Sequence, residues 1–142
     1  MGATYSKRIN KHNFRNKVNK ANEEIHKKYN FQIDPIGHGA FSHVYLASPV
    51  SMPNLVVAIK SLTKFGMTKV HVDSIHDEIE ILAKLEHSNI IKYFESYEDK
   101  YNVFIVTEFL QGYNLGQHLK QKQFTEFGAA SVMNQLVDAI KY

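Results

Sequence analysis

The order in which β-rich runs and helical patterns follow one another is the feature that most constrains this fold. Three runs dominated by aromatic and β-branched residues come first, then one amphipathic segment, then two more β-rich runs. This order is not the alternation of strands and helices that builds a parallel sheet. We therefore expect an α+β fold with a five-stranded antiparallel sheet and one packed helix. The β-rich runs lie at residues 29–37, 41–48, 55–62, 89–99 and 100–109, and the amphipathic segment lies at residues 72–86.

Helical patterns occupy the amphipathic segment and the end of the chain. In the amphipathic segment, Ile75, Ile79 and Leu82 form an inward stripe. Asp73 or Ser74 is placed to cap this helix. Two further helices are predicted at residues 115–121 and 125–142, and in the second an apolar face combines Ala129, Met133, Leu136 and Ile140.

Composition excludes several classes of function. The 142 residues, 44% of them hydrophobic, suffice for one domain but are too few for two. The absence of cysteine excludes disulfides, thiolate nucleophiles and cysteine-based zinc sites. The eight histidines show no metal-ligand spacing, and we interpret them as surface or packing residues. No apolar run approaches the ~20 residues that a membrane-spanning helix needs.

Charge is distributed unevenly along the chain. Residues 1–30 carry eight Lys or Arg against two Glu, whereas residues 31–142 carry nine Lys against twelve Asp or Glu. The basic character therefore belongs to the N-terminal arm, which argues against a nucleic-acid-binding domain. Within this arm an apolar series at helical spacing predicts a short amphipathic helix, and a solvated arm that touches the domain is the alternative. The series is Phe14, Val18, Ala21 and Ile25.

A glycine-rich turn, IGHGAFSHVY at residues 36–45, joins the first two predicted strands. A hairpin of this kind can fold over a phosphate tail, because Gly37 and Gly39 expose backbone N–H groups without obstructing side chains. A strand follows the turn, so the Walker and Rossmann loops, which lead into a helix, are excluded. Taken alone, two glycines are weak evidence, because many hairpins use them.

Two charged residues are predicted in unusual surroundings. Lys60 follows the apolar run VVAI, and strand alternation puts it on the same face as Ala58. A lysine facing a core is costly unless it is paired, and the small Ala58 leaves space for a flat ligand. Glu78 lies on the inward stripe of the predicted helix, and Lys60 is its natural partner. The alternative is an edge-strand lysine that simply reaches water.

Together these features resemble the small lobe of a eukaryotic protein kinase. The resemblance covers residues 29–142 and rests on the runs IGHGAFSHVY, VVAIK, EIEIL, EHSNIIKYFESY and VFIVTEFL in that order and spacing. The runs EIEILAKLEHSNIIK and FTEFGAASVMNQLVDAIKY are most similar to calcium-dependent and calmodulin-dependent serine/threonine kinases. The resemblance implies a basic arm at residues 1–28, an ATP-binding small lobe at 29–110, and the first helices of a helical lobe at 111–142.

The resemblance also implies roles for individual residues. Gly37 and Gly39 would let the loop cover the ATP phosphates with Phe41 at its tip, and Lys60 would hold these phosphates while pairing with Glu78. Thr107 would stand at the back of the adenine slot. The remaining ATP-binding positions implied are Ile36, His38, Ala40, Ser42, Val44, Ala58, Ile91, Glu108, Leu110 and Asn114. Two of these depart from the family: Ser42 replaces the third glycine, and Asn114 replaces an acidic residue that meets the ribose.

Other motifs of the family have no counterpart among residues 1–142. The His-Arg-Asp catalytic loop and the Asp-Phe-Gly metal ligand are missing, so the protein ligands for Mg²⁺ would lie outside this sequence. The last predicted helix stops at Tyr142 without a stop signal, and we expect the chain to be the truncated front part of a kinase. The complete enzyme would transfer phosphate from ATP to Ser or Thr of a protein substrate, whereas these residues alone are expected to be inactive.

The N-terminus predicts membrane attachment. Met1-Gly2-Ala3-Thr4-Tyr5-Ser6 fits the myristoylation pattern at Gly2, and a basic stretch follows that would favour anionic lipid. We therefore expect a cytoplasmic protein held peripherally at the cytoplasmic face of a membrane. An unmodified basic arm is the alternative. Two other hypotheses remain open: a non-catalytic, membrane-tethered interaction module, and a membrane-binding or calmodulin-binding arm for which the lobe is only a scaffold.

Overall fold

The computed structural model describes residues 20–121 and 124–142, which divide into two compact units. The first contains the described residues up to Lys84 together with Tyr93–Phe109. The second contains Leu85–Lys92 and the described residues from Leu110 to Tyr142. No described helix combines the length and the apolar character that crossing a membrane requires.

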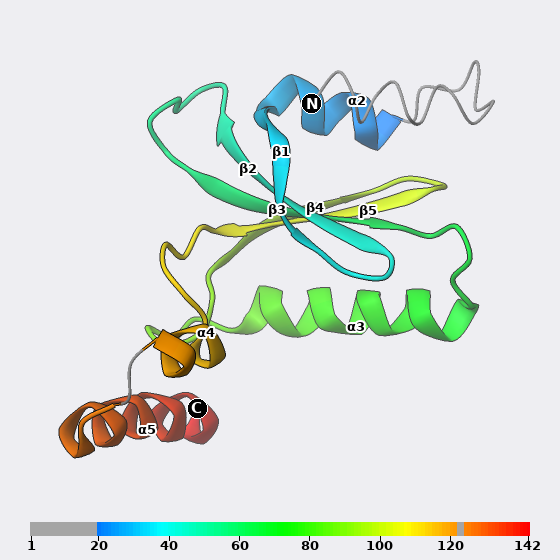
Figure 1. Cartoon of the computed structure of the whole chain (residues 1–142). Helices are drawn as coiled ribbons and strands as arrows, with labels where there is room; N and C mark the ends of the chain where they lie inside the picture. Colours follow the sequence, from blue (N-terminus) through cyan, green and yellow to red (C-terminus); the bar gives the residue numbers. More distant parts are fainter. Residues whose placement is uncertain (1–19, 122–123) are drawn as a thin grey trace. The chain divides into compact units, whose positions relative to one another are not determined.

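The first unit contains a five-stranded sheet in the order β1-β2-β3-β5-β4, with every neighbouring pair antiparallel. This confirms the predicted α+β fold and strand number. Helices α2 and α3 cover opposite faces of the sheet (Figure 1). The elements of this unit are α2 (Lys20–Lys28), β1 (Tyr29–His38), β2 (Ser42–Pro49), β3 (Val57–Thr63), α3 (Lys69–Lys84), β4 (Tyr93–Glu98) and β5 (Asn102–Glu108).

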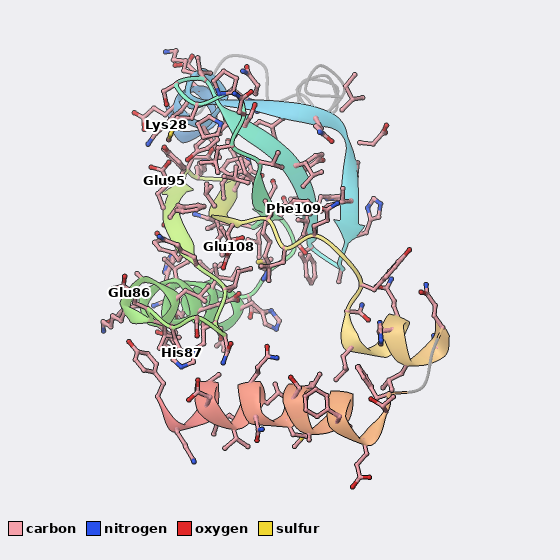
Figure 2. All side chains as sticks on the ribbon, turned by 90° about the vertical axis from the view of Figure 1, so that its left-hand side faces the viewer. Lys28, Glu86, His87, Glu95, Glu108 and Phe109 are labelled. Atoms are coloured by element: carbon pink, nitrogen blue, oxygen red, sulfur yellow. The ribbon has the colours of Figure 1, made fainter. Side chains whose placement is uncertain are left out.

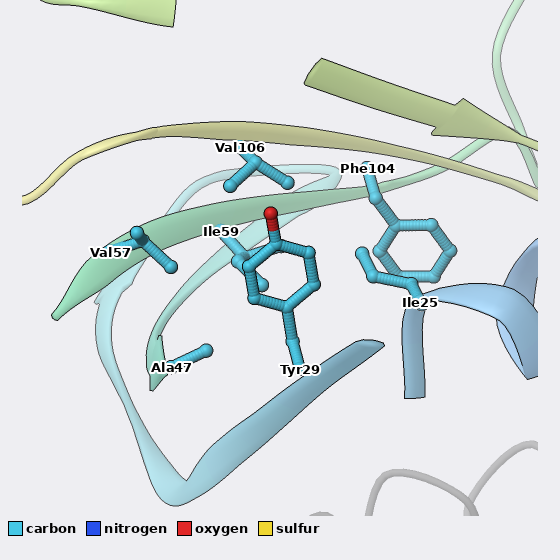
Figure 3. Packing of buried hydrophobic residues seen from close by; sticks show 7 residues of the cluster. All are labelled: Ile25, Tyr29, Ala47, Val57, Ile59, Phe104 and Val106. Atoms are coloured by element: carbon cyan, nitrogen blue, oxygen red, sulfur yellow. The ribbon is translucent and has the colours of Figure 1, made fainter. Parts of the chain in front are cut away.

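The face under α2, called the α2 face below, holds the larger apolar cluster. Ile25 of α2 and Phe104 of β5 are both 0% exposed. Figure 3 shows these side chains meeting Ile59 and Tyr29 over the sheet. The cluster comprises Ile25, Tyr29, Ala47, Val57, Ile59, Phe104 and Val106. Helix α2 therefore seals a face of the sheet that strand alternation made apolar.

Polar contacts attach α2 to β4 beside this cluster. Lys28 Nζ lies 2.5 Å from Glu95 Oε2, and the Tyr29 hydroxyl donates to Glu95 Oε1. Figure 2 shows Lys28 and Glu95 close together at the edge of the unit. Burial, and then the hydrogen bond with Glu95, raises the pKa of the Tyr29 hydroxyl well above its usual range. The described part of the N-terminal arm is thus a helix joined to the sheet by apolar and charged contacts.

The other face, called the α3 face, holds a smaller cluster of Leu62, Ile75, Val103 and Ile105. Ile79 packs against it, so two residues of the predicted inward stripe, Ile75 and Ile79, face this cluster. The predicted cap is wrong. The helix begins at Lys69 rather than near residue 73, and the backbone N–H of His71 donates to Thr68 Oγ1 at 3.3 Å.

Thr68 thus caps the helix, and Ser74 lies inside it with its hydroxyl bonded to Val70 O at 3.0 Å. The early turn was missed because Val70 and Val72 are weak helix formers. The fourth strand also begins later than predicted, at Tyr93 rather than Asn89. In the second unit the Asn89 side chain donates to Gln135 O and Asp138 Oδ2, both at 3.3 Å.

The second unit contains two helices, α4 (Leu115–Gln121) and α5 (Glu126–Lys141). Thr125 caps α5 by accepting a hydrogen bond from the Gly128 backbone N–H at 3.1 Å. The segment before β4 is attached to α5 through His87 and Asp138, whose side chains approach to 3.2 Å. The predicted apolar residues Met133, Leu136 and Ile140 of α5 are exposed.

Candidate nucleotide site

The centre of the candidate site is a lysine–glutamate pair between β3 and α3. Lys60 Nζ lies 3.1 Å from Glu78 Oε1. The two side chains are 38% and 46% exposed, so the pair borders solvent and is not buried in a core. Its Coulomb energy is therefore largely screened, and the pair contributes little to stability. A cation held in this way at an accessible position is suited to binding a phosphate group.

Strand alternation in β3 explains why Lys60 faces α3. Leu62 belongs to the apolar cluster of the α3 face, and Ala58 and Lys60 share its side of the strand. Val57 and Ile59 belong to the α2 face instead. Lys60 lies opposite Val44 on β2 and Ile105 on β5, so it is on a central strand. It is therefore not the edge-strand lysine of the alternative interpretation.

The glycine-rich hairpin between β1 and β2 borders the same face. Gly37 pairs with Val44, which in turn pairs with Lys60. Gly39 and Ser42 close the turn, with the Gly39 N–H donating to Ser42 O at 2.8 Å. A Cβ on Gly39 would lie 2.7 Å from Ser42 Oγ, so a side chain there would need Ser42 to move.

The two loop glycines are not required for backbone conformation. Among the described glycines, positive φ angles occur at Gly66 and Gly112. What Gly37 and Gly39 provide is the absence of a side chain beside Val44 and Ser42. Phe41, predicted at the loop tip, is 41% exposed, and its carbonyl accepts a hydrogen bond from the Thr63 N–H at 2.9 Å. This attachment of the loop tip to the end of β3 had no signal in the sequence.

Thr107 and Glu108 occupy the end of β5. Thr107 lies opposite Ala58 on β3, which puts it on the face that carries Lys60. Its hydroxyl donates to the Glu108 carbonyl at 3.2 Å. Thr107 therefore lies on the same side of the sheet as Lys60, beside the small side chain of Ala58. Its predicted role at the back of an adenine slot stays a prediction.

The structure brings together one group of the predicted residues and assigns another to the second unit. Gly37, Val44, Ala58, Lys60, Glu78 and Thr107 lie on or against the α3 face of the first unit. Ile36, His38 and Ala40, in the same hairpin, are exposed. Ile91, Leu110 and Asn114 belong to the second unit, and Gly2 lies outside the described residues.

Asn114 has a local structural partner that the sequence analysis missed. Its Oδ1 accepts from the Gln117 N–H at 2.8 Å, and Gln117 Oε1 accepts from the Asn114 N–H at 3.1 Å. This reciprocal pair is a capping box at the start of α4. Asn is a strong helix-capping residue, so Asn114 has a structural role at the start of α4.

The comparisons with known proteins agree with this arrangement. The model of the protein kinase domain family matches residues 30–142. The chain is 37% identical over 110 residues to calcium/calmodulin-dependent protein kinase type 1 of Macrobrachium nipponense, covering 77% of this chain and 32% of that protein. The enzyme of the same name from Caenorhabditis elegans is 34% identical over 122 residues, covering 85% of this chain and 34% of that protein. Aurora kinase B of Mus musculus is 34% identical over 116 residues, covering 80% of this chain and 33% of that protein.

The chain therefore belongs to the protein kinase family, and the resemblance inferred from its motifs is confirmed. Among solved structures, the crystal structure of Rad53 1–466 in complex with AMP-PNP matches with a TM-score of 0.72 and 28% identity, covering 83% of this chain and 30% of that one. The chain spans about a third of the length of the curated relatives it matches, at 32% and 34% for the two type 1 kinases.

Proposed function

We propose that this chain is the ATP-binding part of a serine/threonine protein kinase, which in the complete enzyme transfers phosphate from ATP to a protein substrate. The observation that carries the proposal is the 3.1 Å contact between Lys60 and Glu78 on the face bordered by the glycine-rich hairpin. The serine/threonine preference is supported by the similarity to calcium/calmodulin-dependent protein kinase type 1.

The residues present fit ATP in charge and in shape. Lys60 supplies a cation for the phosphates, and Glu78 holds that cation in place. The hairpin at Gly37 and Gly39 brings backbone close to this face without side chains. Ala58 is small enough to leave room for a flat base on the same face. In this proposal Ile36, Val44, Thr107 and the backbone of Glu108 complete the contacts of the first unit.

For residues 1–142 alone we propose weak nucleotide binding and no phosphoryl transfer. Transfer depends on positioning and on charge stabilisation by Mg²⁺, which accompanies ATP in this family. No catalytic base or metal ligand is assigned to these residues. Within residues 20–121 and 124–142, no three His, Asp or Glu side chains form a metal-binding group. We therefore expect no incorporation of radiolabelled phosphate into a general protein substrate, and measurable transfer would overturn this part of the proposal.

A titration followed by NMR tests nucleotide binding directly. With ¹⁵N-labelled protein, ATP and Mg²⁺ should shift the amide signals of Gly37, Gly39, Ala58 and Lys60, with a dissociation constant of about 1 mM. Lys60→Met should remove these shifts, because the phosphates lose their cation. Lys84→Met is the matched control, since Lys84 is an exposed lysine that pairs with Glu80 on α3. Shifts scattered over surface lysines, or a Lys60→Met protein that binds like the wild type, would contradict the proposal.

We also propose that Gly2 is myristoylated and that the basic arm adds affinity for anionic lipid at the cytoplasmic face of a membrane. One acyl chain binds membranes only marginally, and a polybasic stretch is the usual second signal. Intact-mass measurement after co-expression with an N-myristoyltransferase should show one added acyl chain, and Gly2→Ala should abolish it. Sedimentation with phosphatidylserine-containing vesicles should then require both the acyl chain and low salt. An unchanged mass would contradict the proposal that Gly2 is myristoylated.

A further inference from the structure

A three-residue group on the α3 face, away from the Lys60 contact, joins α3 to the sheet. Glu98, the last residue of β4, accepts from Lys64 Nζ through Oε1 and lies 2.8 Å from His76 Nε2 through Oε2. Lys64 follows the end of β3, and His76 lies on α3. We call Lys64, His76 and Glu98 the Glu98 bracket. It connects one helix with the ends of two strands.

The strand end of the bracket is itself firmly held. Lys64 Nζ also donates to the Asp99 carbonyl at 2.5 Å, and the Lys64 backbone N–H donates to Tyr101 O at 2.8 Å. The Asp99 carboxylate accepts from the backbone N–H groups of Tyr101 and Asn102 at 2.7 and 2.8 Å. The turn between β4 and β5 is therefore a rigid attachment point. The turn therefore restricts the movement of His76, the α3 side chain that is bound to it through Glu98.

The Glu98 carboxylate is charged at neutral pH. Partial burial would raise its pKa, but the hydrogen bonds from Lys64 and then from His76 outweigh burial and lower it. The Lys64 side chain is 18% exposed, so this half of the bracket is better shielded from water than an ordinary surface pair. One ionised carboxylate thus accepts from two donors on different elements.

The bracket and the Lys60–Glu78 pair act on the same stretch of helix. His76 and Glu78 are two residues apart on α3: Glu78 contacts Lys60 of β3, whereas His76 contacts Glu98 at the end of β4, which in turn accepts from Lys64. Ile75 and Ile79, which flank these two residues, provide apolar packing that resists separation of the helix from the sheet but specifies its rotation less strictly. Two directed contacts at different places on one helix define its rotation and its axial position.

We propose that Glu98 is a positioning residue that, through His76, holds α3 in the rotation at which Glu78 reaches Lys60. Its importance for phosphoryl transfer rests on the proposed function, but the positioning itself does not. Loss of the bracket lets α3 rotate on its apolar contacts, and Glu78 then separates from Lys60. Glu98 touches no nucleotide in this scheme and acts only through the helix.

The test measures the chemical reactivity of individual lysine amines and uses no nucleotide. The whole chain is treated with a limiting amount of an N-hydroxysuccinimide acetate, and acetylation at each lysine is quantified by peptide mass spectrometry. The contact with Glu78 at 3.1 Å holds the Lys60 amine and restricts the approach of the reagent. Glu98→Gln should raise acetylation of Lys60 about two- to fivefold, the range expected for losing a partly exposed ion pair. Glu78→Gln sets the upper limit of this increase.

Two controls separate positioning from general loosening. Glu80→Gln makes the same chemical change on α3 itself, but Glu80 pairs within the helix with Lys84 at 2.6 Å, so Lys60 should react as in the wild type. At His76, Gln keeps an N–H donor near the position of Nε2, whereas Leu removes it. His76→Gln should therefore preserve the wild-type reactivity of Lys60, and His76→Leu should raise it as Glu98→Gln does. A merely structural loss of the imidazole would affect both variants equally.

Lys64 serves as an internal monitor, because its own amine is released when the bracket opens. If Glu98→Gln raises acetylation of Lys64 but leaves Lys60 unchanged, the bracket opens without moving Glu78 and the proposal is wrong. Equal increases at Lys60 in Glu98→Gln and Glu80→Gln would likewise overturn it. If ATP causes no NMR shifts but Glu98→Gln still raises acetylation of Lys60, the proposed function is contradicted and the positioning role is supported.

Discussion

The two faces of the sheet divide stability and chemistry between them. The α2 face is sealed by side chains that are almost entirely apolar, with Ile25, Ile59, Phe104 and Val106 each 0% exposed. The α3 face has a smaller cluster and carries the exposed pair of Lys60 and Glu78. Both faces are built from the same strands, because consecutive residues of β3 and β5 point to opposite sides. One face of the sheet can therefore carry a charged site, because the opposite face provides most of the apolar burial that stabilises the unit.

Neighbouring residues of β5 provide the strongest test of this division. Phe104 belongs to the α2 face and Ile105 to the α3 face. Phe104→Ala should lower the free energy of unfolding by about 3–5 kcal/mol, because it leaves a large cavity in the better-sealed cluster. Ile105→Ala should cost about 2–4 kcal/mol. Urea unfolding followed by circular dichroism measures both, and a larger loss for Ile105→Ala would reverse the assignment of the two faces.

Helix α2 offers the second test, since it is the element that closes the apolar face. Ile25→Ala should cost about 2–4 kcal/mol of unfolding free energy, because the side chain is fully buried against Phe104 and Ile59. Ile33, which is 60% exposed on β1, is the control, and Ile33→Ala should cost no more than about 0.5 kcal/mol. Equal losses for the two variants would mean that α2 does not cover this face in solution.

Acid titration should reveal the charged attachment of α2. Burial alone would raise the pKa of Glu95, but hydrogen bonds from Lys28, Tyr29 and Tyr97 lower it below its ordinary value of 4.5. A carboxyl with a depressed pKa in the folded state contributes stability above the unfolded value, and this contribution is lost as the pH falls through the folded pKa. Glu95→Gln should therefore flatten the loss of melting temperature below pH 4.5. Because Glu95 is only partly buried and its partner Lys28 is 54% exposed, the effect should be at most about 1 kcal/mol.

If the melting temperatures of Glu95→Gln and the wild type fall equally at acidic pH, the contacts of Glu95 with Lys28 and Tyr29 do not form in solution. Glu80→Gln is a suitable control for this experiment as well. Glu80 also has a lowered pKa, caused by its hydrogen bond with Lys84, but that pair lies wholly on the surface of α3.

The smallest change in stability is expected at the site itself. Lys60→Met should alter the free energy of unfolding by less than about 1 kcal/mol, because the pair with Glu78 is more than a third exposed on both sides. The same substitution should remove the ATP-dependent NMR shifts described above. Differential scanning fluorimetry and the titration, done on one sample, separate the two effects. If Lys60→Met greatly lowered the stability but still bound ATP, Lys60 would have a structural role and not a role in nucleotide binding.

Several features could be predicted from local patterns, and the errors have identifiable causes. Alternation in VVAIK predicted which side Lys60 faces, and helical spacing predicted the inward stripe at Ile75 and Ile79. The start of α3 was misplaced because Thr68 precedes two weak helix-forming valines. The start of β4 was misplaced because Asn89 bonds to α5, a contact 46 or more residues away in sequence. Ile25 was one apolar residue in a basic segment, which left a packed helix and a solvated arm equally open.

The sequence by itself determined the order of elements, the two-residue alternation that divides the sheet into two faces, and the motifs that mark the kinase family. These are properties of short segments, because periodicity and turn chemistry depend on neighbouring residues. Tertiary structure alone decided that α2 closes one face and that Glu98 joins Lys64 to His76. Glu98 lies 34 residues from Lys64 and 22 from His76, so their meeting depends on strand pairing and helix packing. No local pattern carries that information.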